Sequence, residues 1–202
     1  MEIASELESG DATLEIPWAS PNQPHLKYVD LRKFPEKFAS LTECRNNPAL
    51  ARLLQRVNVR GSIFRTAKCD VWVSTKLAHD DKLDFQFPLK VSSYVDLVFE
   101  RSDLRSRFEP HLRLAKKLER SLAGRHLPAR IDIVVRRCLF HGNGHWGYSL
   151  TLFVHAYGAT RSQAKEEWGR ALVSLGDALL RIAPSFIKKR TKGLDPPKRG
   201  AI

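Results

Sequence analysis

Cysteine is scarce in this sequence, and long hydrophobic runs are missing. The 202-residue chain has three cysteines, an odd and widely spaced set. Such a set excludes a disulfide framework and favours a reducing compartment. No apolar run approaches the roughly 18–20 residues that span a bilayer, so we expect no membrane span. Residues 1–20 contain no Lys or Arg, whereas secretory signals and mitochondrial presequences need basic residues. These absences predict a cytoplasmic protein.

Positive charge is concentrated in the second half of the chain. The net charge is +12, made up of −5 over residues 1–20, +4 over residues 21–100 and +13 over residues 101–202. A surface with this excess favours polyanionic partners. Nucleic acid is the expected partner, and an acidic protein is an alternative.

The composition, with 43% hydrophobic residues, predicts one globular domain between two polar ends. Residues 1–25 are acidic and interrupted by three prolines, so we expect a mobile arm there. Residues 26–187 form the predicted α+β domain. Residues 188–202 predict a basic flexible tail, in which Lys188, Lys189 and Arg190 are candidate phosphate contacts.

Hydrophobic periodicity predicts the elements of this domain. Spacings of three and four residues indicate two short N-terminal helices, over 30–41 and from Pro48, and alternation indicates strands over 69–74, 83–91 and 94–99. Residues 78–82 are predicted as a loop.

The second half continues with a helix that has Pro110 in its first turn and ends at Gly124, a long β-hairpin that turns at Asn143-Gly144, and a long C-terminal helix from Thr160 to Pro184. This order favours an antiparallel sheet with helices packed on one face. From Tyr94 onward, a split β-α-β arrangement is an alternative.

The mid-chain helix carries a basic face. Its members recur at i, i+3, i+4 and i+7: Arg113, Lys116, Lys117 and Arg120. Because these residues share one side, opposite the apolar side of Leu112, Leu118 and Leu122, each is a candidate phosphate contact. An ordinary solvated helix face is the alternative.

The start of the last helix is a second candidate phosphate site, since helix N-termini present free N–H groups. Arg161 and Lys165 lie there. The run Gly-Ala-Thr-Arg-Ser-Gln-Ala-Lys over 158–165 resembles the start of the second helix of double-stranded-RNA-binding domains, with Ser162 in place of the second basic residue. The segment is also similar to HicB-type antitoxin domains. The first resemblance implies RNA binding and the second a protein-interaction role.

Aromatic residues follow the second hairpin strand. Phe153 and Tyr157 alternate with Leu150, Leu152 and Val154. If helices cover the leucine face, the two rings form a platform on which bases can stack. Cover by a second layer or by a dimer partner is the alternative.

Cys138, His141 and His145 lie in and beside the hairpin turn. Zinc uses these ligand types, but the spacing provides only part of a module, so we expect no metal. The two histidines could serve as acid and base in RNA cleavage, yet no motif assigns a catalytic residue or a cofactor. The sequence therefore favours a non-catalytic nucleic-acid-binding protein, RNA slightly ahead of DNA. A protein-interaction subunit or homo-oligomer, antitoxin-like or part of a larger assembly, and a small metal-independent nuclease are the alternatives.

Overall fold

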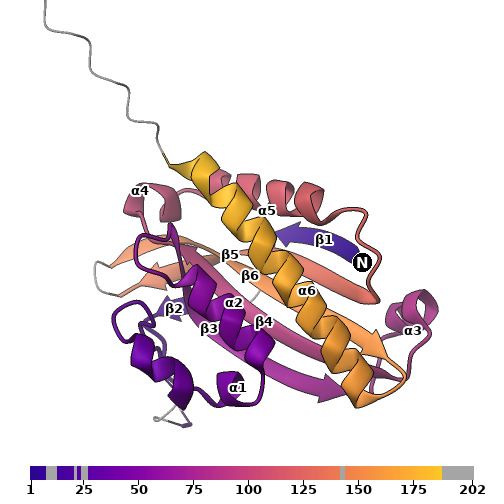
Figure 1. The fold of residues 1–202 in the computed structure, drawn as a ribbon. Helices are drawn as coiled ribbons and strands as arrows, with labels where there is room; N and C mark the ends of the chain where they lie inside the picture. The colour runs from indigo at the N-terminus through magenta and orange to yellow at the C-terminus, as the bar shows by residue number, and fades with distance from the viewer. Residues whose placement is uncertain (8–12, 21, 24–26, 142–143, 188–202) are drawn as a thin grey trace, which may run out of the picture.

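The computed structural model describes residues 1–7, 13–20, 22–23, 27–141 and 144–187. They form a mixed α+β fold, which confirms the predicted class (Figure 1). The strands are β1 (Glu2–Leu7), β2 (Leu14–Ile16), β3 (Phe64–Ser74), β4 (Leu89–Phe99), β5 (Ala129–Phe140) and β6 (His145–Gly158). The α-helices are α1 (Thr42–Arg45), α2 (Pro48–Val57), α3 (His79–Phe85), α4 (Ser102–Arg105), α5 (Phe108–Leu122) and α6 (Arg161–Ile182). Two 3-10 helices, η1 (Pro35–Ser40) and η2 (Ala183–Phe186), complete the described elements.

The sheet is mixed, so the prediction of a purely antiparallel sheet is wrong. Its order is β1-β5-β6-β4-β3, with β2 also paired to β5. The four longest strands pair antiparallel, whereas β1 and β2 both run parallel to β5. Both parallel strands come from residues 1–25, for which the sequence predicts an arm. These two pieces therefore belong to the sheet.

The strand directions also contain the split β-α-β arrangement. β4 and β5 are each antiparallel to β6, which lies between them, so β4 and β5 are parallel to each other. Helix α5 connects them along the chain. A parallel pair needs such a crossover, because a tight turn can join only antiparallel strands.

Helices α2, α5 and α6 lie together on one face of the sheet (Figure 1). Alternate β6 residues, among them Leu150, Leu152 and Val154, point into the core beneath them. Trp168 of α6 is buried there, and its indole N–H donates to Oγ of Ser93 over 2.9 Å. Because successive side chains of a strand point to opposite faces, the residues between these core positions lie on the other face of the sheet.

The prediction for residues 78–91 is wrong in its first half. Residues 79–85, divided between a predicted loop and a predicted strand, form helix α3, and β4 begins at Leu89. The ring of Phe85 stacks on Tyr157 at 4.0 Å between centroids and 8° between planes. Asp81 accepts hydrogen bonds from the Tyr157 hydroxyl and from Lys90 Nζ, each over 2.6 Å. These contacts with distant strands hold the helix, and no local pattern encodes them.

One other element prediction differs in its bounds. The stretch over 30–41 contains a 3-10 helix over Pro35–Ser40, where Pro35 stands at the first turn. The mid-chain helix begins at Phe108, so Pro110 lies in its first turn, as the sequence predicts. At the start of α6, Oγ1 of Thr160 accepts a hydrogen bond from the backbone N–H of Gln163, which is the usual contact of a threonine that caps a helix.

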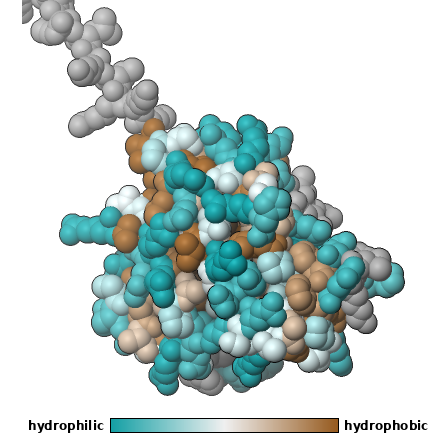
Figure 2. Space-filling model, turned by 45° about the vertical axis from the view of Figure 1, so that its right-hand side comes forward, coloured by the Kyte–Doolittle hydropathy of each residue, from teal (hydrophilic) through white to brown (hydrophobic). Residues whose placement is uncertain are grey.

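The surface is mostly hydrophilic on the side shown in Figure 2, where hydrophobic residues form small scattered groups. Within the described residues, no helix combines the length and the apolarity needed to cross a membrane. Cys44, Cys69 and Cys138 are all free thiols. Burial raises the pKa of the Cys44 thiol to about 11.

Candidate nucleic-acid interface

The sheet face opposite the helices is covered at two places. At one end, α3 covers Tyr157. Towards the other end, Ile16 packs against Ala67 and Cys138, and the Trp18 indole N–H donates to the carbonyl oxygen of Ala67 over 2.8 Å. We call residues 13–20 the covering segment. Partly exposed side chains of β3, β4, β5 and β6 lie between these two covers.

Four of these side chains form an aromatic patch: Trp72, Tyr94, Phe153 and His155. They come from three adjacent strands, and ring centroids are separated by 6.3 Å from Trp72 to Tyr94 and by 5.9 Å from Tyr94 to Phe153. His155 closes the group at 6.2 Å from Phe153 and 6.5 Å from Trp72. Trp72 is 38% exposed. The patch therefore presents several ring surfaces side by side.

Cations lie over the rings of the patch and of the covering segment. Lys68 Nζ is 5.1 Å from the ring centre of Trp18 and 5.8 Å from that of Tyr94. The guanidinium of Arg136 is 5.7 Å from the ring centre of Phe153. Attraction between a cation and a ring face orients both groups. The positive charges therefore stand next to the surfaces on which a base can stack.

Polar partners fix the ring of His155. Its Nδ1 lies 2.8 Å from Oγ of Ser92, and its Nε2 lies 3.5 Å from Oδ2 of Asp132. Arg130 Nε donates to Oδ1 of the same aspartate over 2.8 Å. The chain of contacts from Ser92 through His155 to Asp132 resembles the catalytic triad of a hydrolase. However, Ser92 is fully buried. The arrangement therefore orients the imidazole and offers no accessible nucleophile.

Asp96 is the buried acid of this face. It is 4% exposed, and Oδ1 accepts a hydrogen bond from the Thr151 hydroxyl over 2.5 Å. Burial raises the pKa of the Asp96 carboxyl to about 6, while the hydrogen bond from Thr151 and the charges of Arg136 and Lys68 oppose this rise. A buried carboxyl of this kind marks a candidate functional position.

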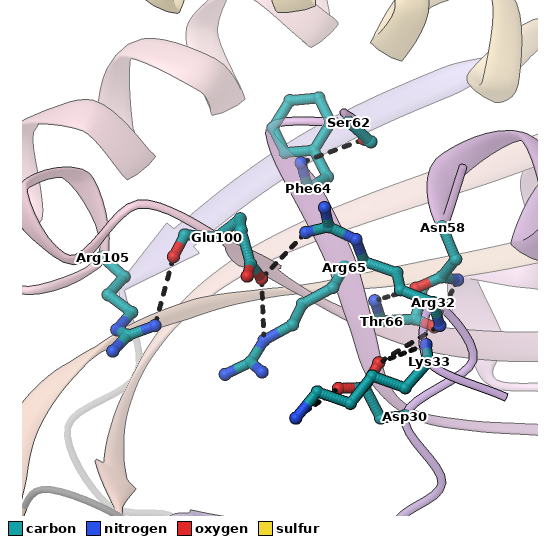
Figure 3. A network of polar contacts seen from close by, with 10 residues as sticks. All are labelled: Asp30, Arg32, Lys33, Asn58, Ser62, Phe64, Arg65, Thr66, Glu100 and Arg105. Carbon is teal, nitrogen blue, oxygen red and sulfur yellow. Dashed lines mark hydrogen bonds and ion pairs between the residues drawn. The ribbon is translucent and has the colours of Figure 1, made fainter. Parts of the chain in front are cut away.

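A polar network holds residues 30–33 against the ends of β3 and β4 (Figure 3). Oε2 of Glu100 lies 3.0 Å from Arg32 Nη1 and 3.6 Å from Arg65 Nε. Asp30 Oδ1 accepts a hydrogen bond from the backbone N–H of Arg32 over 3.1 Å. Arg105 Nη1 donates to the backbone carbonyl of Glu100 over 3.2 Å. The network therefore fixes the chain that follows the covering segment.

The predicted basic face of α5 is present as one surface. A single groove is lined by Arg113, Lys116, Lys117 and Arg120 together with Glu109 and Leu112. The prediction that Leu112 lies on the opposite, apolar side of the helix is therefore wrong, because Leu112 is one turn before Lys116 and shares its side. The guanidinium of Arg113 also lies 4.3 Å from the ring centre of Phe186, in the 3-10 helix η2 that follows α6. Because α5 packs on the helix side of the sheet, this surface is separate from the aromatic patch.

Arg161 and Lys165 lie at the other end of α6. Lys165 Nζ donates to the backbone carbonyl of Asn46 over 2.7 Å, and both basic residues line a pocket with Trp72 and Asp70. The 22 residues of α6 span roughly 33 Å at 1.5 Å per residue. The structure therefore does not join this site to the α5 face near Phe186. Lys188, Lys189 and Arg190 lie outside the described residues.

Of the two predicted platform rings, the structure leaves only Phe153 accessible. Tyr157 is fully buried, stacked on Phe85 and hydrogen-bonded to Asp81. Helix α3, which the sequence does not predict, is the reason. Sequence reasoning does not identify five residues of this face: Lys68, Trp72, Tyr94, Asp96 and Arg136. The spacing of two residues between Asp70 and Trp72, and between Tyr94 and Asp96, is the sequence signal that each pair shares one face of its strand.

The hairpin residues do not converge. Cys138 is buried with Ile16 and Phe140, whereas the His141 ring pairs with Glu15 over 2.7 Å. His145 lies in an exposed groove beside Trp146. Among the residues that the structure describes, no group of three His, Cys, Asp or Glu side chains is placed to hold a metal.

Comparison of the chain with protein-family models, with curated proteins and with solved structures finds no significant match. The functional argument therefore depends on the geometry of the chain itself.

Proposed function

We propose that the protein binds single-stranded nucleic acid in the cytoplasm, RNA ahead of DNA, without catalysing a reaction. The aromatic patch on the open sheet face is the observation that carries this proposal. Its rings come from three adjacent strands and lie 5.9–6.5 Å apart. Exposed rings on a sheet that helices cover from behind are a common platform for unpaired bases.

The charge of the molecule supports a polyanionic ligand. A net charge of +12 attracts nucleic acid over distance. At the patch itself, Lys68, Arg130 and Arg136 are matched by Asp70, Asp96 and Asp132. Stacking therefore supplies more of the affinity there than phosphate contacts do.

This balance gives the proposal a measurable signature. Each phosphate contact on a single strand contributes about −0.7 to the slope of log affinity against log salt. Contacts from Lys68 and Arg136 predict a slope of about −1.4. Binding along the four cations of α5 predicts about −2.8 instead. The slope thus distinguishes the two surfaces.

Fluorescence anisotropy with a labelled 12-nucleotide RNA of mixed sequence, measured from 50 to 300 mM salt, tests the proposal. Trp72→Ala and Phe153→Ala are each expected to weaken binding about 5- to 150-fold, because a stacked base contributes roughly 1–3 kcal/mol. Phe34→Ala is the matched control, since Phe34 is exposed and lies outside the patch. It should bind like the wild type.

Three results would overturn the proposal. The first is no binding by the wild type at 50 mM salt, and the second is unchanged binding by both patch variants. The third is a steep dependence of log affinity on log salt that the triple variant Lys116→Ala/Lys117→Ala/Arg120→Ala makes shallower. The last result would move the site to α5.

A further inference from the structure

A pocket of about 640 Å³ lies beside the aromatic patch, between the covering segment and the sheet. Its walls include Trp18, Lys68, Tyr94, Asp96, Arg136 and Phe153. The volume falls within the range of small-molecule sites, which combine apolar walls with a few polar groups. The pocket is continuous with the patch, because Tyr94 and Phe153 belong to both.

The wall formed by the covering segment is anchored at several points. Leu14–Ile16 pairs with β5, and the carbonyl of Ile16 accepts a hydrogen bond from the backbone N–H of His141 over 2.9 Å. The carbonyl of Trp18 accepts a hydrogen bond from the backbone N–H of Tyr28 over 2.8 Å, and the Trp18 indole N–H donates one to the carbonyl of Ala67. The pocket is therefore formed before a ligand enters.

Asp96 is a buried acid in the wall of the pocket, and only part of its hydrogen-bonding capacity is used. A carboxylate offers about four acceptor positions on its two oxygens. Thr151 fills one position on Oδ1, and no other side chain among the described residues hydrogen-bonds to Asp96. A ligand with N–H donors would supply what this carboxylate lacks.

The aromatic walls and the carboxylate together select one kind of ligand. Flat rings are favoured between aromatic side chains. Among the four RNA bases, only guanine presents two adjacent N–H donors, N1–H and N2–H, on its pairing edge. Adenine, cytosine and uracil place an acceptor next to their donor, and this acceptor would repel a carboxylate. The ammonium of Lys68, which has three donors and no acceptor, suits the neighbouring O6 of guanine.

We infer that this pocket holds one unpaired guanine of the bound strand, with the Asp96 carboxylate accepting hydrogen bonds from N1–H and N2–H. The inference rests on the proposed function, because the strand reaches the pocket from the aromatic patch. The patch then supplies affinity for any sequence, and the pocket supplies base selection.

Four labelled oligonucleotides test this division: seven uridines with G, A, C or U at the central fourth position, measured by anisotropy. The wild type is expected to bind the G strand about 5- to 150-fold more tightly than the others, since a bidentate contact of this kind discriminates by roughly 1–3 kcal/mol. Asp96→Asn should bind all four strands within about threefold of one another. Unlabelled GMP should compete better than AMP for the G strand.

Two further variants separate the pocket from the patch and guard against a folding defect in Asp96→Asn. Lys68→Met leaves Asp96 in place and should reduce the preference for G. Trp72→Ala should weaken all four strands equally and keep the preference. Equal binding of the four strands by the wild type, or preference for another base, overturns the guanine site and leaves the proposed function standing. No binding of any strand overturns both.

Discussion

The hydroxyl of Thr151 donates a 2.5 Å hydrogen bond to Oδ1 of Asp96, its direct partner on the neighbouring strand. The bond stabilises the ionised carboxylate inside the sheet, where burial disfavours charge. Thr151 therefore controls the protonation of the group that we place at the base-selecting pocket.

Thr151→Val tests this relationship. Loss of the donated hydrogen bond should raise the pKa of Asp96 above its value of about 6, by about one pH unit if the bond contributes roughly 1.5 kcal/mol. Carboxyl carbon shifts in an NMR titration measure it directly. Thr151→Ser keeps the hydroxyl and is the matched control. An unchanged pKa in the valine variant would show that the hydrogen bond has no influence on the carboxyl.

Asp96→Asn should change how stability depends on pH. The pKa of Asp96 is about 6 in the folded protein, against 3.8 in the unfolded chain, so the folded state binds the proton more tightly. Its contribution to stability is present below pH 4 and is lost as the pH rises through 6, by about 3 kcal/mol. The asparagine variant lacks this loss. Since the unfolded carboxyl is already partly ionised at pH 4, urea unfolding at pH 4 and pH 7 should show the variant gaining about 2 kcal/mol relative to the wild type.

His111 has the opposite linkage. It is fully buried, with Nδ1 2.8 Å from the Arg107 carbonyl oxygen, and burial lowers its pKa to about 4 from 6.5. The contribution of His111 to the free energy of unfolding is fully present above pH 6.5. As the pH falls through 4, the protein loses about 3 kcal/mol of this stability. His111→Phe cannot titrate, so its stability should fall less between pH 7 and pH 4. Equal acid sensitivity in variant and wild type would contradict the buried neutral imidazole.

The two linkages oppose each other over nearly the same pH range. Between pH 4 and pH 6, protonation of Asp96 favours the folded state, and protonation of His111 favours the unfolded state. The contributions of these two groups therefore nearly cancel in the wild type, and each single variant should expose the other.

Two glycines near or within α6 should respond to alanine in opposite directions. A Cβ at Gly158 would lie 2.5 Å from the backbone nitrogen of Ala164, so Gly158→Ala must displace the start of the helix. At Gly169 the nearest atom is the Ala49 Cβ at 3.5 Å, an ordinary contact. We expect Gly158→Ala to lose about 1–3 kcal/mol and Gly169→Ala to gain up to about 1 kcal/mol through helix propensity. Thermal unfolding measures both, and similar effects at the two positions would refute the packing argument.

Local patterns predicted the elements whose contacts are local. The hairpin of β5 and β6 follows from alternation around a turn that contains Gly144, which adopts a φ of +61°. The residues over 83–91 alternate equally well, yet Phe85 ends a helix there, since its ring meets Tyr157 more than 70 residues away. Periodicity over so short a stretch carries no information about a contact with a residue so distant in the sequence.

The candidate site was predictable only in part. Phe153 was identified because Leu150, Leu152 and Val154 mark the buried face of its own strand. Asp96 and Thr151 are 55 positions apart, and only the register of β4 with β6 brings them together. A single sequence does not specify which strands are neighbours, so no pattern could place a buried carboxyl beside Lys68 and Arg136.

The parallel pairing of β1 with β5 has a consequence for synthesis. Glu2 and its partner Arg130 are separated by 128 positions. At roughly 5–20 residues per second, a ribosome needs about 6 to 26 s to make the intervening chain. During that time β1 has no β5 to pair with, and Glu2 and Glu6 place like charges along it, which disfavours pairing with the same strand of a neighbouring nascent chain. β1 can therefore join the sheet only after β5 has been made.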